Sequence, residues 1–275
     1  MSGRTVIVTG ASSGIGAAAA QAFGRAGDRV VLTARRLDRL QAVASGLPDT
    51  LVVAADLSRG EDIHRVVAEA AARYGPVDVL VNNAGLGRYN WLEQLTEDDI
   101  RTQIGVNLVA PILMTRAVLP DMLERRRGVI INVGSVACKI ATPTMSIYNA
   151  AKFGLDGFSE ALRREVGSQG VHVCVIYPGP VDGTELGRDR REKNVGLTMA
   201  RGRLRNQRWL RTDTERVARA IVGLADRPRP SLVTPAIYSV GITVNAMNPS
   251  LVDRLVSRAA RRARETAPPG AARNT

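Results

Sequence analysis

Short runs of apolar residues alternate along the chain with longer segments in which apolar residues recur every three or four positions. The short runs, rich in Val, Ile, Leu and Thr, lie at residues 5–8, 29–33, 51–54, 77–81, 129–133, 171–176 and 232–234. Runs of this kind are typical of parallel strands buried on both faces, and the longer segments suit right-handed crossover helices. The pattern predicts a doubly wound α/β fold with a seven-stranded parallel sheet and helices on both faces.

No linker or internal repeat divides the chain, so we expect a single domain over residues 1–265. An uncharged stretch at 230–252 is long enough to span a bilayer, but three prolines interrupt it and it contains the seventh predicted strand. We expect instead a C-terminal helical extension over 236–265, with its second helix starting at Pro249. The composition of residues 266–275 predicts a disordered tail.

A glycine-rich turn follows the first predicted strand and precedes an alanine-rich helix: Thr9-Gly10-Ala11-Ser12-Ser13-Gly14-Ile15-Gly16. Glycines let the backbone turn tightly, so that the N–H groups of the helix N-terminus can bind a pyrophosphate. The turn predicts a dinucleotide site formed by Gly10, Ser12, Ser13, Gly14, Ile15 and Gly16. A tight strand-to-helix connection without a ligand also fits, because the spacing is one residue longer than the usual fingerprint.

A second group of polar residues, Ser135, Tyr148 and Lys152, follows the fifth predicted strand. Tyr148 and Lys152 lie four residues apart, which places both side chains on one face of a helix. A tyrosine has an ordinary pKa of about 10, and a neighbouring ammonium lowers that pKa by favouring the phenolate. Tyr148 could then exchange a proton with a substrate oxygen to which Ser135 donates a hydrogen bond. A Tyr–Lys pair on a solvated helix face is the alternative.

The order and spacing of these motifs over residues 4–185 resemble the short-chain dehydrogenase/reductase family, whose members have a Rossmann-type fold. The family pattern is present as the glycine-rich turn, Asn82-Asn83-Ala84-Gly85, Asn107, Ser135, Tyr148-x-x-x-Lys152 and Pro178-Gly179-Pro180-Val181. The resemblance implies hydride transfer between a nicotinamide cofactor and a carbonyl or alcohol, with Asn107, Ser135, Tyr148 and Lys152 as catalytic residues. It also implies that Lys152 binds the nicotinamide ribose and that Asn107 holds a relay water. Asn107 could instead cap or kink its helix.

The resemblance also implies where the remaining parts of the cofactor lie. Asp56 and Leu57 would flank the adenine. The adenosine ribose would be lined by Asn82, Ala84 and Gly85. The nicotinamide would be bordered by Pro178, Gly179 and Val181. Thr184 lies close to the position of the family's threonine and would also bind the cofactor.

The end of the second predicted strand bears on the choice between NAD(H) and NADP(H). Sites for NAD(H) place an acidic residue there, which binds the ribose 2′-OH and repels a 2′-phosphate, but this chain has Ala34 followed by Arg35 and Arg36. Arg35 can bind a 2′-phosphate and stack on adenine, and Ser12 or Ser13 can add a hydroxyl. We therefore predict NADP(H) rather than NAD(H), although the two arginines could simply begin the next helix.

The predicted function is thus an NADP(H)-dependent carbonyl reductase or alcohol dehydrogenase. The alternatives are an NAD-linked alcohol or hydroxysteroid dehydrogenase and a non-catalytic nucleotide-binding scaffold. The loops after the fourth, fifth and sixth strands contain apolar residues that favour an apolar or lipid-like carbonyl as substrate. The alternative is that these residues only pack within the loops. They are Tyr89, Trp91, Ile140, Met145, Leu186, Leu197, Met199 and Trp209.

We expect no metal site, because His64 and His172 have no ligand companions. Cys138 is either reactive or a small buried residue.

Composition fits a globular protein, with 45% hydrophobic and 23% charged residues and a net charge of +12. Basic residues gather at 188–211, which suits an acidic carrier such as acyl carrier protein or coenzyme A, anionic lipid, or a solvated face. The arginine-rich C-terminal helix could cap the substrate site, join subunits or lie on a membrane. No nucleic-acid motif accompanies these charges.

Two further expectations concern assembly and location. The resemblance implies a homo-oligomer whose subunits join through the helices that carry Asn107 and Tyr148. The chain has two cysteines and lacks the N-terminal pattern of a signal peptide, which predicts a cytoplasmic protein. If the basic helix binds lipid, the protein would associate peripherally with a membrane.

Overall fold

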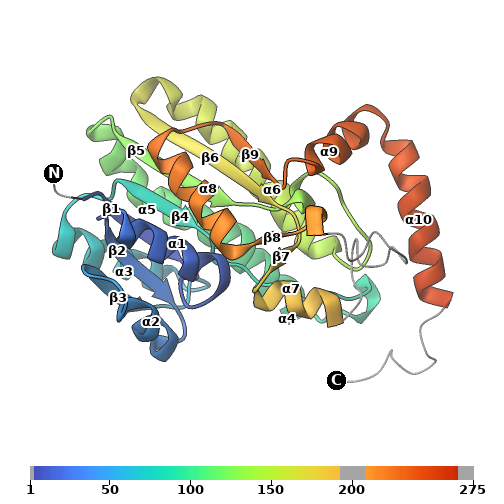
Figure 1. Cartoon of the computed structure of the whole chain (residues 1–275), viewed down its shortest axis with the longest axis horizontal. Helices are drawn as coiled ribbons and strands as arrows, with labels where there is room; N and C mark the ends of the chain where they lie inside the picture. The colour runs from blue at the N-terminus through green and yellow to red at the C-terminus, as the bar shows by residue number, and fades with distance from the viewer. Residues whose placement is uncertain (1–2, 193–207, 266–275) are drawn as a thin grey trace.

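The computed structural model describes residues 3–192 and 208–265. Its main sheet has seven parallel strands in the order β3-β2-β1-β4-β5-β6-β9 (Figure 1). The strands are β1 (Thr5–Thr9), β2 (Arg29–Ala34), β3 (Thr50–Ala54), β4 (Val79–Asn82), β5 (Gly128–Val133), β6 (Val171–Pro178) and β9 (Ser231–Thr234). The predicted doubly wound sheet is confirmed. The sequence pattern missed a second, two-stranded sheet, formed by β7 (Val181–Asp182) and β8 (Thr212–Asp213).

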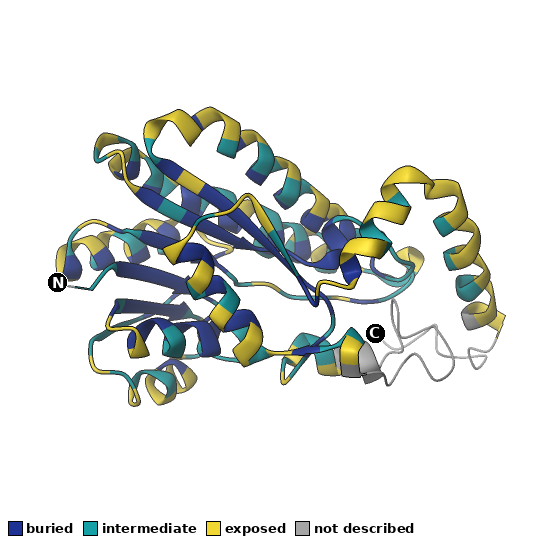
Figure 2. Ribbon diagram, turned by 45° about the horizontal axis from the view of Figure 1, so that its top comes forward, coloured by how far each residue is buried: buried dark blue, intermediate teal, exposed yellow. Residues whose placement is uncertain are grey.

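Helices cover both faces of the main sheet. One face packs against α1 (Gly14–Arg25), α2 (Leu37–Ala44) and α8 (Thr214–Asp226), and the other against α3 (Gly60–Tyr74), α5 (Ala110–Glu124) and α6 (Ser146–Val166). In β1, Val6 and Val8 pack toward α1 and α8, whereas Ile7 packs toward α3 and α5. Figure 2 shows the buried strands between helices whose outer faces are exposed. Burial on both faces explains why the strands are continuously apolar.

One helix runs without a break from 97 to 124 and comprises α4 (Glu97–Ile104), a π-helical turn (Gly105–Val109) and α5. It begins at a capping box in which the Thr96 side chain accepts a bond from the Asp99 N–H (3.1 Å). Within the described residues, only this helix is long and apolar enough to cross a membrane. Core helices meet the same criteria, and here Met114 and Val118 are buried in the main core.

A buried polar network joins β4 and β5 to the helices behind them. Asn82 Nδ2 donates to Asn132 Oδ1 (2.9 Å) and to Thr115 Oγ1 (3.1 Å), and Asn132 Nδ2 donates to Ser159 Oγ (2.8 Å). All four side chains are buried. Buried polar groups cost stability when they lose a partner, so this network holds β4, β5, α5 and α6 in one arrangement.

Replacing Asn132 by alanine should lower the free energy of unfolding by about 2–3 kcal/mol, because Asn82 and Ser159 would each lose a buried partner. Urea denaturation followed by circular dichroism measures this change. The control is Gln41→Ala on the exposed side of α2, for which we expect a change within about 0.5 kcal/mol. An Asn132→Ala protein as stable as the control would show that the network contributes no net stability.

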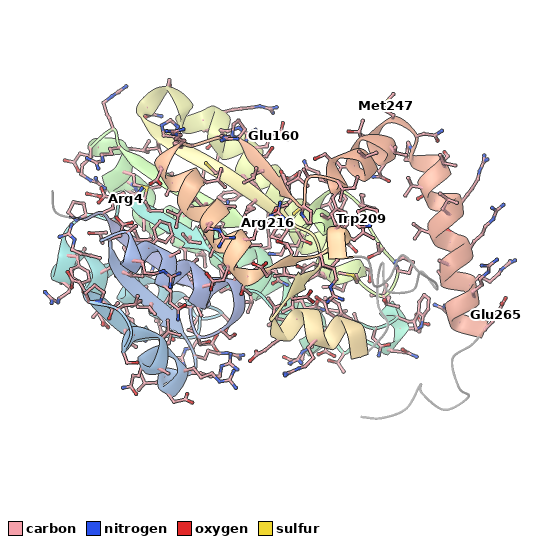
Figure 3. All side chains as sticks on the ribbon, in the orientation of Figure 1. Arg4, Glu160, Trp209, Arg216, Met247 and Glu265 are labelled. Carbon is pink, nitrogen blue, oxygen red and sulfur yellow. The ribbon has the colours of Figure 1, made fainter. Side chains whose placement is uncertain are left out.

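Beyond β9 the chain leaves the sheet as two helices, α9 (Tyr238–Met247) and α10 (Pro249–Glu265), in the range of the predicted extension. Met247 lies at the outer bend between them and Glu265 at the far end of α10 (Figure 3). That far end contacts the body of the protein, since the Arg264 guanidinium lies 4.0 Å from the Trp91 ring centroid and 3.0 Å from Glu93. The predicted disordered tail, 266–275, is outside the described residues.

Candidate active site

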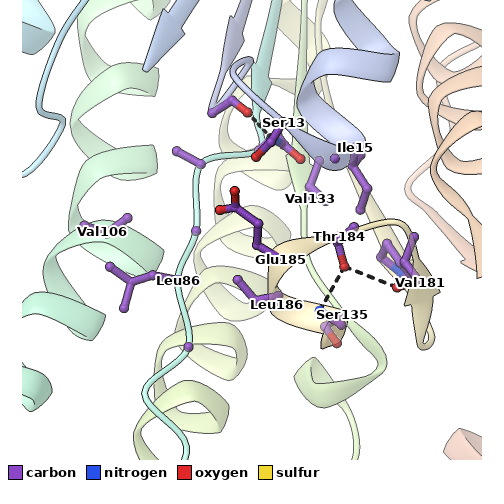
Figure 4. Close-up of a pocket in the computed structure, with 18 of the residues that line it drawn as sticks. Ser13, Ile15, Leu86, Val106, Val133, Ser135, Val181, Thr184, Glu185 and Leu186 are labelled. Atoms are coloured by element: carbon purple, nitrogen blue, oxygen red, sulfur yellow. Dashed lines mark hydrogen bonds between the residues drawn. The ribbon is translucent and has the colours of Figure 1, made fainter. Parts of the chain in front are cut away.

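A cavity of about 590 Å³ lies at the carboxyl ends of β1, β2, β4, β5 and β6 (Figure 4). The strand order reverses between β1 and β4, and open α/β sheets bind ligands at such a point. Most of the predicted site residues line this cavity: Gly10, Ser12, Ser13, Gly14, Ile15, Arg35, Arg36, Asp56, Leu57, Ala84, Gly85, Ser135, Tyr148, Lys152, Pro178, Gly179, Val181 and Thr184. The exceptions are Gly16, Asn82 and Asn107.

The glycine-rich turn has the geometry that a phosphate needs. Gly10 and Gly14 have positive φ angles of 65° and 57°, which side chains rarely adopt. A Cβ on Gly10 would lie 2.8 Å from the Ala84 Cα, so only glycine fits there. Helix α1 begins at Gly14 with no side-chain cap and no acidic residue in its first turn, so its N-terminal N–H groups suit an anion. Gly16 packs against the Gly10 carbonyl rather than lining the cavity.

The loop after β4 corrects the expectation for Asn82. Its side chain lies in the buried network described above, and Asn83 lines the cavity instead. Asn83 Nδ2 donates to the Thr9 carbonyl (2.9 Å), and Thr9 Oγ1 accepts bonds from the N–H groups of Asn83 and Ala84, both at 2.9 Å. Asn83 therefore ties this loop to the glycine-rich turn. Successive residues of a strand point to opposite sides, a signal that could have distinguished the two asparagines.

Ser135, which follows β5, lines the cavity together with Tyr148 and Lys152 of α6. Tyr148 and Lys152 are 6% and 5% exposed, so they are not a solvated surface pair. Lys152 Nζ donates to the Val133 carbonyl (2.9 Å) and lies 5.8 Å from the Tyr148 ring centroid. Ser135 Oγ accepts a bond from the Ala137 N–H (3.1 Å), which leaves the hydroxyl hydrogen available to a substrate oxygen.

Burial lowers the pKa of Lys152 below the ordinary lysine value, because the low-dielectric interior disfavours the ammonium. A nearby negative charge or additional hydrogen-bond acceptors favour the ammonium, so its charge depends on what the cavity holds.

The thiol of Cys138 lies behind Ser135. Cys138 is 1% exposed, and its Sγ accepts a bond from the Ser135 N–H (3.3 Å). Burial raises the pKa of this thiol to about 11, so it stays protonated near neutral pH. Of the two alternatives for Cys138, the structure agrees with the buried, unreactive one.

Asn107 lies in the π-helical turn, fully buried and outside the cavity lining. Its Oδ1 accepts a bond from the Leu86 N–H (3.0 Å) and its Nδ2 donates to the Leu86 carbonyl (2.8 Å). A Cβ on Gly85 would lie 3.0 Å from Asn107 Oδ1 and 4.0 Å from Lys152 Nζ. Asn107 thus lies close to Lys152 and holds the loop after β4, while its part in a proton relay stays a prediction.

The apolar residues predicted for the substrate side are only partly brought together. Tyr89, Met145 and Leu186 pack around Tyr148, and the two tyrosine rings meet edge to face with centroids 5.8 Å apart. Among the described members of the predicted apolar set, Leu186 lines the cavity.

Three other apolar candidates do not line the cavity. Trp91 contacts Arg264, Trp209 is 53% exposed, and Ile140 packs near Gly241 of α9. Leu197 and Met199 are outside the described residues.

A charged cluster at the outer end of the cavity includes two residues that the sequence analysis missed, Arg39 and Glu185. Glu185, the first residue of α7 (Glu185–Glu192), lies 2.9 Å from Arg36 and 2.6 Å from Arg39. Arg36 also donates to Ser12 Oγ (3.3 Å) and Ser13 Oγ (3.2 Å). The hydrogen bond from Arg36, with that from Arg39, holds the pKa of Glu185 below its ordinary value. Arg39 lies one helical turn after Arg36, which was its only signal in the sequence.

The two histidines do not contribute to the cavity. His64 on α3 and His172 on β6 are both exposed. Over 3–192 and 208–265, no group of three or more His, Cys, Asp or Glu side chains is placed to hold a metal ion.

The chain is similar in sequence to known oxidoreductases, and the matched residues include most of those that line the cavity. A family model described as short chain dehydrogenase matches residues 4–195. A 3-oxoacyl-[acyl-carrier-protein] reductase of Bos taurus is 35% identical over 222 residues, 80% of this chain and 90% of the relative. An 11-beta-hydroxysteroid dehydrogenase-like protein of Arabidopsis thaliana is 39% identical over 188 residues, 66% of this chain, and this chain spans 62% of its length.

A solved metagenomic short-chain oxidoreductase in complex with NADP is 32% identical, with a TM-score of 0.69 over 85% of this chain and 98% of that one. The family match includes the glycine-rich turn, the loop after β4 and the helix with Tyr148 and Lys152, all of which contribute residues to the cavity. The chain therefore belongs to the short-chain dehydrogenase family of oxidoreductases.

Proposed function

We propose that this protein is an NADP(H)-dependent oxidoreductase that interconverts a ketone or aldehyde and an alcohol, with Tyr148 as the general acid and base. The observation that carries the proposal is that Ser135, Tyr148 and Lys152 line the same cavity as the glycine-rich turn. Two hydroxyls beside a buried lysine suit a substrate oxygen, and the turn suits the pyrophosphate of a dinucleotide.

In reduction, the hydroxyls of Ser135 and Tyr148 would both donate hydrogen bonds to the carbonyl oxygen. A bound nicotinamide would supply the hydride, or accept it in the reverse direction. Tyr148 would give its proton to the oxygen as negative charge develops there, and Ser135 would stabilise that charge. The ammonium of Lys152 would favour the resulting phenolate. Asn107 and Lys152 would return a proton from solvent through a bound water.

Arg35 supports the choice of NADP(H). Its side chain is exposed, lines the cavity and has no hydrogen-bond or ion-pair partner within the described part of the chain. Ala34, at the end of β2, offers no carboxylate to a ribose 2′-OH. The NADP complex of the solved relative agrees with this choice. One observation favours the alternative, an NAD-linked dehydrogenase. Arg36 and Arg39 already pair with Glu185, and arginines held in this way are less available to a 2′-phosphate.

For the substrate we propose an apolar or lipid-like carbonyl, because Leu186 and the buried ring of Tyr89 pack beside Tyr148. Helix α10, which contacts the loop at Trp91, would cap the substrate side. An acyl group on an acidic carrier also fits the net charge of +12 and the name of the bovine relative. Exposed Val240, Met247 and Leu255 on α9 and α10 suit a subunit interface or a membrane surface.

A titration of the purified protein with NADPH and NADH side by side tests this function, followed by turnover of a panel of apolar ketones with the tighter cofactor. Tight NADPH binding with turnover is the expected result. Tighter NADH binding would favour the NAD-linked alternative, and binding of neither would favour a non-catalytic scaffold.

Replacing Arg35 by alanine should weaken NADPH binding by about 10- to 100-fold, because the 2′-phosphate would lose a charge-assisted hydrogen bond. NADH binding should change by less than about threefold, since NADH carries no 2′-phosphate. Calorimetric titration measures both constants. Arg219→Ala on the exposed side of α8 is the control for the loss of one positive charge. Equal weakening of NADPH and NADH would remove the case for NADP(H).

A further inference from the structure

Glu185 brings the segment after β7 into contact with the segment after β2. Its Oε1 accepts bonds from Arg36 Nη1 (2.9 Å) and Arg39 Nη1 (2.6 Å), and its Oε2 accepts one from Arg36 Nη2 (3.3 Å). Figure 4 shows the Glu185 side chain extending from the start of α7 into the cavity that Ser13 also lines. The Glu185 side chain is 46% exposed, so a ligand that enters from solvent can reach it.

The groups that hold Glu185 are of the kinds that commonly bind phosphates. Two guanidiniums converge on one carboxylate, and Arg36 also contacts the hydroxyls of Ser12 and Ser13 on the glycine-rich turn. Guanidiniums bind carboxylates and phosphates with the same planar pairs of N–H groups. A phosphate dianion and the Glu185 carboxylate would repel each other at this place, so they compete for the two arginines.

We propose that the Glu185 carboxylate occupies part of the site for the cofactor 2′-phosphate at Arg36 and Arg39, and that a bound 2′-phosphate displaces it. This inference rests on the proposed function only in taking an adenine nucleotide as the ligand. It makes Glu185 a determinant of cofactor specificity, which lowers the affinity for phosphorylated cofactors and leaves unphosphorylated ones nearly unaffected.

Displacement of Glu185 would also affect the residues beside Tyr148, because Glu185 and Leu186 are neighbours at the start of α7. Thr184 Oγ1 donates to the Val181 carbonyl (3.2 Å) and accepts a bond from the Gly187 N–H (2.9 Å), which fixes the start of α7. The next residue, Leu186, packs against the cluster around Tyr148. A 2′-phosphate therefore releases the contact that Glu185 makes at the start of α7, whereas a cofactor without that phosphate leaves this contact in place.

The test compares two ligands that differ only by the 2′-phosphate, adenosine 2′,5′-bisphosphate and adenosine 5′-monophosphate, by calorimetric titration of the full chain. In Glu185→Gln the bisphosphate should bind about fivefold more tightly than in the wild type, the scale of one half-exposed ion pair. Binding of the monophosphate should change by less than about twofold.

The matched control is Glu215→Gln, which removes the same charge from a similarly exposed glutamate paired with Arg25, the last residue of α1, at the end of that helix away from the glycine-rich turn. We expect less than a twofold change for both ligands. Bisphosphate binding that is unchanged or weaker in Glu185→Gln would overturn the proposal, and so would an equal gain in Glu215→Gln.

A variant that lacks both arginines separates two explanations for tighter bisphosphate binding in Glu185→Gln. One is that Glu185 competes with the phosphate for Arg36 and Arg39, and the other is that the protein has lost one negative charge. In the Arg36→Met, Arg39→Met double variant, adding Glu185→Gln should give a smaller gain for the bisphosphate than it gives in the wild type, because only the repulsion between the two anions is relieved there. A gain at least as large as in the wild type would contradict competition at these two arginines.

The ligand preference of the wild-type protein tests the NADP(H) proposal separately. A wild type that prefers the monophosphate, together with a Glu185→Gln protein that gains the bisphosphate, would reject NADP(H) and support the role of Glu185. A wild type that prefers the bisphosphate, together with no gain in Glu185→Gln, would support NADP(H) and reject the role of Glu185.

Discussion

Replacing Tyr148 by phenylalanine should lower the rate of carbonyl reduction by about 10²- to 10⁴-fold, the contribution typical of a positioned general acid. The substitution removes only the hydroxyl, so the ring should keep its edge-to-face contact with Tyr89 and its place in the cluster beside Leu186. Ser135 can still donate a hydrogen bond to the substrate oxygen, but the phenol proposed to give its proton to that oxygen would be gone. Steady-state kinetics with the cofactor that binds more tightly measure the loss.

The loss should appear in turnover rather than in cofactor binding, and NADPH affinity should stay within about threefold of the wild type. Tyr74→Phe is the matched control, because Tyr74 also loses a buried hydroxyl, one that donates to Asp49 (2.7 Å) at the end of α3, away from the cavity. We expect turnover close to the wild-type value in that variant. A Tyr148→Phe protein with more than about a tenth of wild-type turnover would exclude Tyr148 as the acid.

Replacing Lys152 by methionine should lower turnover by about 10²-fold or more and weaken cofactor binding as well. The ammonium that favours the phenolate would be lost, and with it the group predicted to bind the nicotinamide ribose. For alcohol oxidation, the pH profile should shift to higher pH, because the phenolate would form without a positive neighbour. Kinetics measured across a pH series separate this effect from a simple loss of folded protein.

The stability of the Lys152→Met protein distinguishes a catalytic role from a structural one. Burial lowers the pKa of Lys152 in the folded protein, so the unfolded chain binds more protons in the pH range below the ordinary value of 10.5. The contribution of Lys152 to the free energy of unfolding therefore rises with pH through that range, and methionine removes this slope. We expect stability near neutral pH to be unchanged or higher, since no buried charge remains. A large loss of stability with proportionate loss of activity would indicate a structural lysine.

Much of the fold could be predicted because its signals are local. The seven apolar runs each became a strand, since a segment that is apolar on both faces is stable only inside a sheet covered by two helix layers. The spacing of Tyr148 and Lys152 predicted a shared helix face, and the glycine-rich turn predicted backbone conformations that Gly10 and Gly14 adopt. The short β7–β8 sheet was missed because a two-residue strand has no periodicity to detect.

The misplaced residues share one cause, which is that their orientation depends on distant partners. Asn82 turns toward Asn132, 50 residues away in sequence, because the pleat of β4 directs it into the core. Trp91, predicted for the substrate pocket, contacts Arg264 because α10 bends back onto the body of the protein. Neither partner is within the range of a helical or strand repeat, so the local pattern contains no signal for them.

By itself the sequence determined the doubly wound sheet, the glycine-rich turn and the residues that could perform proton transfer, because strand burial, glycine geometry and helical spacing are properties of neighbouring residues. Only the tertiary structure decided which side chains meet. It brought Ser135 to Tyr148 and Lys152, and it placed Glu185 on arginines that lie 149 and 146 residues before it. Those contacts depend on how the loops at the carboxyl edge of the sheet pack against one another, and packing joins residues regardless of their separation in sequence.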